Sequence, residues 1–342
     1  MADVIVVGGG PAGCAFAVTA TRCGHRATVL DEGRRLRTWP GEALPAGGGE
    51  LVASVFGADV LNGHAPAYGT SAAWGSAELV DHSFMAHWSG HGWHLDRGAF
   101  DESLRDVARD VGVTVVTERV HAIDGDASAW RVNDRWSGQW LVDASGRAGA
   151  IVSRLGAHRV RIDEQVALVG VVPDRGGERV TTVEAVRDGW WYSAPLPAGR
   201  RVAAYVTDAD LAPAHRSAGW EGLLHQTLHV RDLVGSVGHV DVRAYPADTT
   251  YREEIVGRGW LAVGDAAVAF DPLSSQGLVT GIVMAARAGA MLSDGLEGWA
   301  ADYRAVLDEH IALRAEVARA ERRWPDSAFW RRRQQDLSPV PR

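Results

Sequence analysis

The sequence predicts an α/β fold in which a parallel-sheet domain is interrupted by a mostly antiparallel β-sheet insertion and followed by C-terminal helices. Three observations predict it. A buried strand, a glycine-rich turn and a helix open the chain. A strand-rich segment with polar turns occupies 160–255, and a buried strand followed by a small-residue helix returns from 260. Strands that alternate with helices are typical of a parallel sheet covered by helices.

The first unit is a strand, a helix and a second strand. Residues 3–7 contain the uninterrupted apolar run Val4–Val7, which is typical of a strand buried on both faces. Residues 11–23 have helical character up to Gly24, which is suited to end a helix. Residues 26–30 are expected to form the second strand, so the unit is a βαβ motif.

The rest of the chain predicts further strands and helices. A glycine-rich loop leads into a short helix at 50–57, and apolar residues at helical spacing predict a helix over 98–111. Strands are expected within 78–96 and over 113–117, 119–123, 128–132, 139–143 and 260–263. Helices are expected over about 275–293 and over 297–334, the second broken at Pro325.

Composition excludes several classes of protein. The 342 residues carry a net charge of −8, so a basic surface for nucleic acid is not expected. No apolar run is long enough to span a membrane and no secretory leader precedes the first strand, so we expect a cytoplasmic protein without membrane contact. All 35 basic residues are arginine, which excludes chemistry that requires a lysine amine.

The two cysteines predict no metal or redox chemistry. Cys14 and Cys23 are interpreted as buried small hydrophobic residues, with a redox pair as the alternative. No spacing of cysteine and histidine matches a zinc site, so no metal is expected.

The turn after the first strand fits the dinucleotide-binding pattern G-x-G-x-x-G. Gly8 permits the tight turn, Gly10 allows a pyrophosphate to approach the backbone, and Gly13 allows close packing of helix and strand. The helix N-terminus offers free N–H groups to the phosphates. The candidate cofactor-binding residues of this loop are Gly8, Gly10, Pro11, Ala12 and Gly13.

An acidic residue is expected to bind the adenosine ribose. Glu32 lies 19 residues after Gly13, at the end of the second predicted strand, where a carboxylate accepts hydrogen bonds from ribose hydroxyls. Asp31 is the neighbouring alternative. A carboxylate at this place disfavours a 2′-phosphate.

Two motifs late in the chain distinguish a flavin from a nicotinamide. Residues 260–267 form a buried run that contains Gly-Asp, and 271–278 (Asp-Pro-Leu-Ser-Ser-Gln-Gly-Leu) open a helix. This arrangement resembles the p-hydroxybenzoate hydroxylase superfamily of FAD enzymes. The resemblance implies that Asp265 binds ribityl or ribose hydroxyls of FAD and that the loop containing Pro272 lies beside the isoalloxazine ring. Candidate N–H donors to the reduced ring are Gly277 and Leu278.

Further segments resemble the tryptophan-halogenase-like branch of this superfamily. Residues 41–45 (Gly-Glu-Ala-Leu-Pro) are similar to a stretch near the flavin in halogenase-like members. Residues 141–147 (Leu-Val-Asp-Ala-Ser-Gly-Arg) are similar to the strand end that closes the FAD domain. The resemblance also implies that Arg97 contacts FAD, with a salt bridge at the helix start as the alternative.

With this resemblance, the expected fold is a Rossmann-like FAD-binding domain of the GR2 type with an inserted antiparallel substrate sheet. The FAD-binding domain is expected in three parts: 1–75, 98–159 and 258–295. The substrate domain is expected at 76–97 and 160–257, and a C-terminal helical segment at 296–342.

The branch indicates the reaction. Tryptophan halogenases carry a Trp-x-Trp-x-Ile-Pro signature and a catalytic lysine, and this chain has neither. Residues 73–76, 92–97, 189–192 and 271–277 look most like flavoproteins that accompany quinone-cofactor amine and amino-acid oxidases and hydroxylate a tryptophan side chain in a partner protein or precursor. The open alternatives are a small-molecule monooxygenase or natural-product tailoring oxidoreductase, and a reductase or dehydrogenase resembling geranylgeranyl reductases.

The resemblance implies an FAD-dependent monooxygenase. NAD(P)H or a separate flavin reductase reduces FAD, O2 is the co-substrate, and a flavin C4a-hydroperoxide transfers oxygen to an electron-rich aromatic ring. The expected substrate is an aromatic small molecule or a peptidyl side chain, and the expected partner is an oxidase or a precursor peptide. A second dinucleotide loop is not visible, so reduced nicotinamide binds transiently or a reductase supplies the electrons.

Histidine and aromatic side chains are the candidates for chemistry at the substrate. Among the histidines before Arg97, His94 and then His87 are the candidate catalytic residues, because histidine titrates near neutral pH. A structural role on a strand or at the surface is the alternative. Trp190 and Tyr192 alternate onto one strand face, with Trp191 on the other. Candidate substrate-pocket residues are Trp74, Trp190 and Tyr192, with core packing as the alternative.

Overall fold

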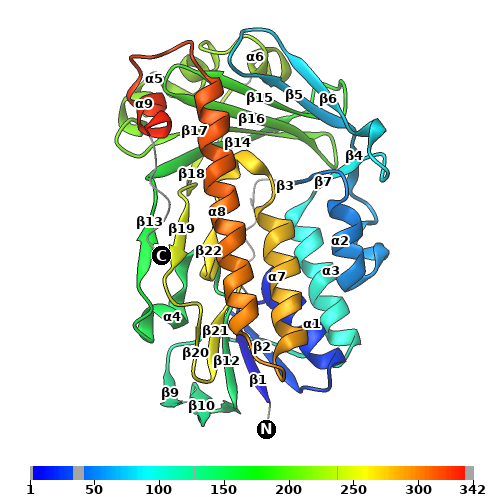
Figure 1. The fold of residues 1–342 in the computed structure, drawn as a ribbon. Helices are drawn as coiled ribbons and strands as arrows, with labels where there is room; N and C mark the ends of the chain where they lie inside the picture. The colour runs from blue at the N-terminus through cyan, green and yellow to red at the C-terminus, as the bar shows by residue number, and fades with distance from the viewer. Residues whose placement is uncertain (1–2, 34–41, 127, 237, 336–342) are drawn as a thin grey trace.

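The computed structural model describes residues 3–33, 42–126, 128–236 and 238–335. A six-stranded sheet forms the lower part of the molecule in Figure 1, and a seven-stranded sheet lies above it. The long helix α8 (Glu297–Ala320) runs beside both sheets (Figure 1).

The six-stranded sheet has the order β20-β21-β12-β1-β2-β8. All its neighbouring strands are parallel except β20, which is antiparallel to β21. Its strands are β1 (Val4–Val7), β2 (Ala27–Asp31), β8 (Thr114–Thr117), β12 (Trp140–Asp143), β20 (Val256–Gly257) and β21 (Trp260–Ala262). Because β1 lies between two partners and under helices, all four of its residues are buried apolar side chains.

Three helices lie side by side against one face of this sheet: α1 (Pro11–Arg22), α3 (Arg97–Asp110) and α7 (Gly277–Met291) (Figure 1). Helices α1 and α7 approach closely, since a Cβ atom at Gly289 would lie 2.6 Å from the Phe16 carbonyl oxygen. Helix α3 begins where the Asp96 carboxylate accepts from the N–H groups of Gly98 and Ala99. Helix α2 (Gly48–Phe56) packs beside them, and α4 (Ala150–Arg154) follows β12.

Three smaller sheets connect the two large ones or extend them. The first joins β3 (Glu42–Leu44), β7 (Gly92–Leu95) and β4 (Ala65–Ala67). The second joins β11 (Trp136–Gly138), β10 (Ala129–Val132) and β9 (Ile123–Asp126). The third joins β13 (Arg159–Arg161), β19 (Thr250–Arg252) and β22 (Val268–Ala269). Short 3₁₀ helices are η1 (Ala58–Leu61), η2 (Phe84–Ala86), η3 (Gly146–Ala148), η4 (Gly264–Ala266) and η5 (Pro272–Ser274).

The seven-stranded sheet has the order β18-β14-β17-β16-β15-β5-β6 and is antiparallel except between β15 and β5. Its strands are β5 (Gly69–Ala73), β6 (Val80–Ser83), β14 (Gln165–Pro173), β15 (Val180–Val186), β16 (Gly189–Leu196), β17 (Arg200–Asp208) and β18 (Arg243–Pro246). It therefore takes β5 from a segment that precedes residue 76. The chain ends, within the described residues, with α8 and α9 (Ala328–Gln334), which are separated around Pro325.

The two faces of the seven-stranded sheet pack against different elements. Trp191 lies in a cluster with residues of α5 (Ala212–Leu224) and α6 (Val230–Val234). Trp190 and Tyr192 lie in another cluster, with side chains of α9 and of the loop before α7. The predicted alternation of these three aromatic residues is confirmed. We call the face of Trp190 and Tyr192 the inner face.

The segment predicted as mostly β at 160–255 has most of its regular structure in strands, and it also contains α5 and α6, which cover the outer face of the sheet. Two expectations were wrong. The strand expected at 119–123 begins only at Ile123, because the Asn133 side chain takes the N–H groups of His121 and Ala122. Cys23 is exposed at the end of α1, whereas Cys14 is buried. Burial raises the pKa of the Cys14 thiol to about 12.

Candidate functional site

The glycine loop between β1 and α1 is packed tightly except at one position. A Cβ atom at Gly8 would lie 2.2 Å from the Ala144 carbonyl oxygen, and one at Gly13 would lie 2.0 Å from that of Gly8. A Cβ atom at Gly10 would meet no protein atom within 4 Å. The loop is therefore closed against the sheet and open at Gly10, where glycine lets a ligand approach the backbone.

Helix α1 begins at this opening. Pro11 is its first residue, Gly10 is its N-cap, and no side chain in the described part of the chain caps it. The first-turn N–H groups thus present the positive end of the helix dipole at the open side of the loop. A pyrophosphate group fits this arrangement of an open glycine and uncapped N–H groups.

Asp265 lies in η4, which packs against the N-terminus of α1. A Cβ atom at Gly264 would lie 2.6 Å from the Ala12 Cβ, so η4 touches the first turn of α1. The Asp265 side chain is 43% exposed, and Arg147 Nε lies 3.6 Å from its Oδ2. Burial raises the pKa of the Asp265 carboxyl, and the charges of Arg147 and Arg97 oppose that rise. The Asp265 carboxylate is therefore surrounded by protein but still partly accessible to solvent, which places it in a recess.

Arg97 belongs to the same recess. It is the first residue of α3, its side chain is 10% exposed, and its Nε lies 3.1 Å from Asp101 Oδ1. Its charge also acts on Asp265. The structure thus brings Arg97, Asp265 and the glycine loop together from three distant segments.

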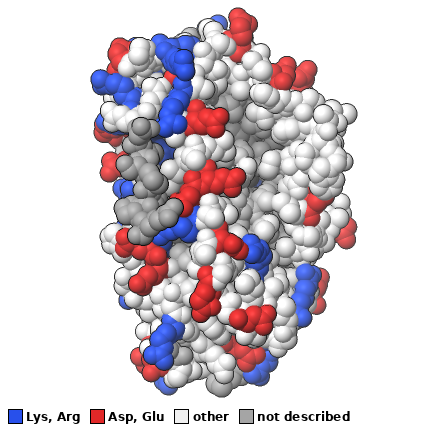
Figure 2. Space-filling model, viewed as in Figure 1, with Lys and Arg blue, Asp and Glu red and all other residues white. Residues whose placement is uncertain are grey.

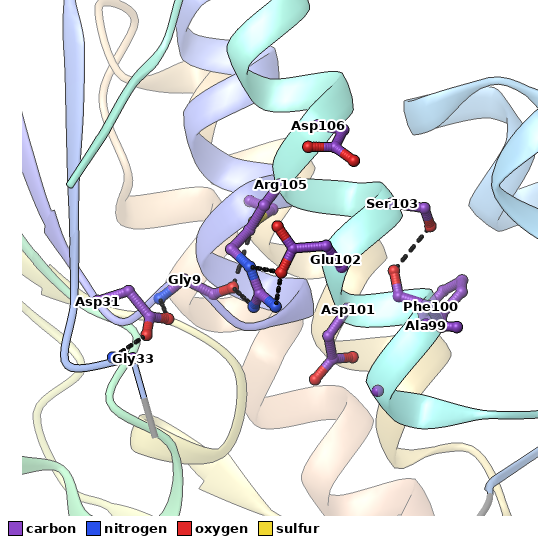
Figure 3. Close-up of polar contacts among 12 residues, drawn as sticks. Gly9, Asp31, Gly33, Ala99, Phe100, Asp101, Glu102, Ser103, Arg105 and Asp106 are labelled. Carbon is purple, nitrogen blue, oxygen red and sulfur yellow. Dashed lines mark hydrogen bonds and ion pairs between the residues drawn. The ribbon is translucent and has the colours of Figure 1, made fainter. Parts of the chain in front are cut away.

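The two acidic residues at the end of β2 have different surroundings. The Asp31 carboxylate accepts from the N–H groups of Gly9 and Gly33, at 2.8 and 2.7 Å (Figure 3). The Glu32 side chain is 42% exposed, and its Oε2 lies 3.9 Å from Arg119 Nε. Asp31 therefore holds the loop, whereas Glu32 is accessible beside it. The assignment of Glu32 to a ribose stays a prediction.

The loop at residues 270–278, which we call the ring loop, ends at the N-terminus of α7. The Asp271 carboxylate accepts from the Leu273 N–H at 3.1 Å and so caps η5, which starts at Pro272. Gly277 is the first residue of α7, and no side chain among the described residues caps this helix. The N–H groups of Gly277 and Leu278 therefore lie at the positive end of its dipole.

Two arginines that the sequence analysis did not select hold the ring loop. Arg147 donates from Nη2 to the Phe270 carbonyl oxygen at 2.6 Å and from Nη1 to that of Asp248 at 2.5 Å. Arg314 of α8 is 5% exposed; its Nε lies 2.7 Å from Asp271 Oδ2 and its Nη1 2.8 Å from Asp163 Oδ2. Arg147 ends the 141–147 motif, which was a signal for it. Arg314 has no local signal, because its partners are distant in sequence.

The two candidate catalytic histidines differ in burial. His94 on β7 is fully buried, and its Nε2 lies 3.1 Å from Thr181 Oγ1 of the seven-stranded sheet. Its pKa falls to about 4, first because of burial and then because of the nearby charges of Arg201 and Arg179.

His87 is half-buried and lies near the turn at Gly47 and Gly48, which packs against the start of α7. Its Nδ1 lies 2.8 Å from Ser89 Oγ, which also accepts from the Gly47 N–H at 3.0 Å. A Cβ atom at Gly47 would lie 3.1 Å from His87 Cε1, and one at Gly48 would lie 3.2 Å from Val279 Cγ2 in the first turn of α7. The turn at Gly47 and Gly48 thus lies between His87 and the start of α7. Gly41 of the 41–45 motif lies outside the described residues.

The candidate pocket aromatics gather on the inner face. The rings of Trp74 and Trp190 are 6.4 Å apart, and that of Trp74 is 5.2 Å from Trp330 of α9. Tyr192 and Leu273 of the ring loop belong to the same apolar cluster. The inner face therefore meets the ring loop. Figure 2 shows a hollow beside α8, below the seven-stranded sheet, on a surface where acidic and basic residues are interspersed.

Two further properties concern the described residues as a whole. They contain no group of three or more His, Cys, Asp or Glu side chains placed to hold a metal ion. Within the same ranges, every helix is too short or too polar to cross a membrane.

The chain is similar to known flavoproteins over nearly its whole length. The tryptophan halogenase family matches residues 70–339, and an FAD binding domain matches residues 3–55. The putative FAD-dependent oxidoreductase LodB of Marinomonas mediterranea is 30% identical over 97% of this chain and 96% of its own length. A tryptophan 2-halogenase of Chondromyces crocatus is 25% identical over 80% of this chain and 58% of its own length.

Solved structures have the same fold. QhpG, a peptidyl tryptophan dihydroxylase essential for tryptophylquinone cofactor biogenesis, is 27% identical with a TM-score of 0.78, over 98% of this chain and 80% of QhpG. The myxobacterial chondrochloren halogenase CndH is 22% identical with a TM-score of 0.85, over 97% of this chain and 85% of CndH. The predicted fold class is confirmed by these similarities.

Proposed function

We propose that this chain, which belongs to the tryptophan halogenase family and is an FAD-dependent oxidoreductase, is a monooxygenase that hydroxylates an electron-rich aromatic ring. The proposed substrate is a tryptophan side chain in a partner protein or precursor peptide. QhpG, which is named as a peptidyl tryptophan dihydroxylase, supports this substrate class by its similarity. The proposed partner is a quinone-cofactor oxidase or its precursor.

The observation that carries the proposal is the contact between the ring loop and the inner face. Trp74, Trp190 and Tyr192 share one apolar cluster with Leu273 of the ring loop. Aromatic side chains bind a flat ring through stacked or edge-on contacts. Trp190 is buried, so a substrate ring would meet this cluster at the half-buried Trp74 and Tyr192, next to the loop that is proposed to support the flavin ring.

The composition of the chain argues against halogenation. The tryptophan halogenases that the chain resembles use a lysine between flavin and substrate, and this sequence contains no lysine. Arginine does not replace it, because a guanidinium keeps its proton and is a poor nucleophile at neutral pH. The proposed hydroxylation does not require a lysine.

The residues of the site would contact FAD in sequence from its pyrophosphate to its isoalloxazine ring. Gly10 and the N-terminus of α1 would hold the pyrophosphate, and Asp265 with Arg97 the ribityl end. Gly277 and Leu278 would place N–H groups at the ring. When bound, FAD supplies two-electron transfer and the activation of O2. We propose that NAD(P)H, bound transiently, or a flavin reductase supplies the electrons.

We assign the proton transfer to His87 rather than to His94. His94 is fully buried, bonded to Thr181, and neutral at pH 7 because its pKa is about 4. A base with so low a pKa removes a proton poorly at neutral pH. His87 is half-buried, and the Ser89 N–H donates to its Nδ1 at 3.2 Å, so its Nε2 is the ring atom that can exchange a proton at the substrate.

The experiment that tests the substrate class compares peptidyl with free tryptophan. The protein is supplied with FAD, NADH and a flavin reductase, and offered free tryptophan, N-acetyltryptophanamide and tryptophan-containing peptides of the oxidase precursor. We expect oxygen to be added to the peptide and little conversion of free tryptophan. Conversion of the free compounds alone would favour the small-molecule monooxygenase, and products without added oxygen would favour a reductase or dehydrogenase.

A further inference from the structure

The middle residue of the glycine loop is held from two sides by charged side chains. The Gly9 N–H donates to Asp31 Oδ2 at 2.8 Å, and the Gly9 carbonyl oxygen accepts from Arg105 Nη1 at 3.0 Å (Figure 3). Asp31 also takes the Gly33 N–H at 2.7 Å, which fixes it at the end of β2. Both peptide groups that flank Gly9 therefore have a set orientation.

Arg105 reaches the loop from α3 and is itself fixed. Its Nε and Nη2 donate to Glu102 Oε2 at 3.2 and 2.7 Å, and its side chain is 17% exposed. Figure 3 shows the guanidinium between Glu102 and the Gly9 carbonyl. A guanidinium held through two of its nitrogens has little freedom left, so its third nitrogen is directed at the loop.

The contact with the carbonyl has a consequence for the next N–H group. The peptide bond is planar and trans, so the Gly9 C=O and the Gly10 N–H point in opposite directions. Arg105 holds the carbonyl toward α3, and the Gly10 N–H is thereby turned away from α3. Gly10 is also the position of the loop at which a Cβ atom would meet open space.

Charge adds to this geometry. Arg105 is the cation between two carboxylates, those of Glu102 and Asp31, beside a loop suited to an anionic pyrophosphate. Without Arg105, the charge of Asp31 would remain uncompensated near the phosphates, and Glu102 would keep only its contact with the exposed Arg109. The Asp31 carboxylate would then oppose binding, because charges of like sign repel at short range.

We propose that Arg105 is a positioning residue of the pyrophosphate site, which orients the Gly10 N–H through the Gly9 carbonyl and offsets the charge of Glu102 and Asp31. Glu102 serves this role by holding Arg105. The role concerns the adenosine diphosphate half of FAD and is independent of the hydroxylation proposed above.

The test is a titration of the apoprotein with two ligands, FAD and ADP, the second of which lacks the flavin. Arg105→Gln removes the charge and the contact with Gly9. Arg109→Gln is the matched control, because Arg109 also binds Glu102, at 3.3 Å, but is 44% exposed and contacts Asp106 rather than the loop. Flavin absorption of the bound FAD and the melting temperature of the apoprotein are recorded for each variant.

We expect Arg105→Gln to weaken FAD and ADP by the same factor, about 10- to 100-fold, as the loss of one charge-assisted hydrogen bond predicts. The spectrum of bound FAD should not change, and Arg109→Gln should bind both ligands as the parent protein does. Arg105→Lys, which keeps the charge, should recover part of the ADP affinity.

Two results would overturn the proposal. One is ADP affinity in Arg105→Gln equal to that in Arg109→Gln. The other is a loss of FAD affinity without a loss of ADP affinity, which would place the effect at the ring. If Arg105→Gln does not fold, Arg105→Lys tests the proposal in its place. A folded Arg105→Lys variant that binds ADP with the affinity of the parent protein would contradict a role for the guanidinium contact with Gly9.

Discussion

The two ends of the proposed FAD site are built by different means. At the glycine loop, most of the residues that set the shape lie within one βαβ unit, and the constraint is steric: a Cβ atom at Gly13 would lie 2.0 Å from a carbonyl oxygen. At the ring loop, the shape depends on Arg147 and Arg314, which bind it from other segments through hydrogen bonds and ion pairs. One end is therefore fixed by local packing and the other by long-range electrostatic contacts.

A large effect should come from filling the glycine loop. Gly13→Ala places a Cβ atom against the backbone of Gly8, which cannot move aside, and should destabilise the apoprotein by roughly 3 kcal/mol. Gly10→Ala should leave the apoprotein as stable as the parent, because its Cβ atom meets no protein atom, and should weaken FAD binding. Urea unfolding and FAD titration measure both. Equal stability of the two variants would contradict the claim that steric packing fixes the glycine loop.

At the ring loop, the corresponding test removes a charge. Arg314→Met leaves Asp271 and Asp163 buried without their shared cation and should lower the free energy of unfolding by about 3–5 kcal/mol. Arg287→Met is the control, since Arg287 forms an ion pair with Asp302 in which both side chains are about half exposed; it should cost about 1 kcal/mol or less. If both substitutions cost the same, the ring loop does not depend on its buried ion pairs.

A smaller difference is expected between two carboxylates along the cofactor. Asp265→Ala should weaken FAD binding by about 1.5–3 kcal/mol, the value of a lost charge-assisted hydrogen bond. Glu32→Ala should weaken it less, because Glu32 is proposed to hold only one end of the adenosine ribose, whereas Asp265 is proposed to hold the linker between the flavin ring and the phosphates. Fluorescence titration of the two apoproteins with FAD gives the ratio. A greater loss in Glu32→Ala would reverse the assigned importance of the two residues.

A further effect concerns the pH dependence of His94. The unfolded chain protonates this histidine near pH 6.5, whereas the folded chain does so only near its pKa of about 4. The folded state therefore loses stability as the pH falls from about 6.5 toward 4, by roughly 2 kcal/mol between pH 7 and pH 5. His94→Gln lacks this loss, so its unfolding free energy should fall less over that interval. His310 and His64, whose pKa values burial also lowers, contribute equally to both proteins.

Sequence alone could predict the features that are local in the chain. The superfamily, the fold class and FAD as cofactor are confirmed by the matched families and relatives. The strands and helices around Gly8–Gly13, and the helix starting near Gly277, lie where the apolar patterns and glycines placed them. Such features depend on residues a few positions apart, which a sequence displays directly.

The features that the sequence could not predict depend on contacts between residues that are far apart in the chain and become neighbours only in the folded protein. Arg314 is one of three arginines on α8, and only the structure places it between Asp271 and Asp163. Arg105 is similar to Arg109 in its helix, yet only Arg105 reaches the Gly9 carbonyl. The roles of His87, His94 and the inner-face aromatics depend on a substrate and stay proposals.

The measurement that tests the account most directly follows the fate of oxygen in a single turnover. The protein carrying reduced FAD is mixed with ¹⁸O₂ and a tryptophan-containing precursor peptide, with and without bromide, and the product is analysed by mass spectrometry. We predict a peptide that has gained ¹⁸O on its indole ring in equal yield with and without bromide. A brominated peptide, or an oxidised product without ¹⁸O, would contradict it.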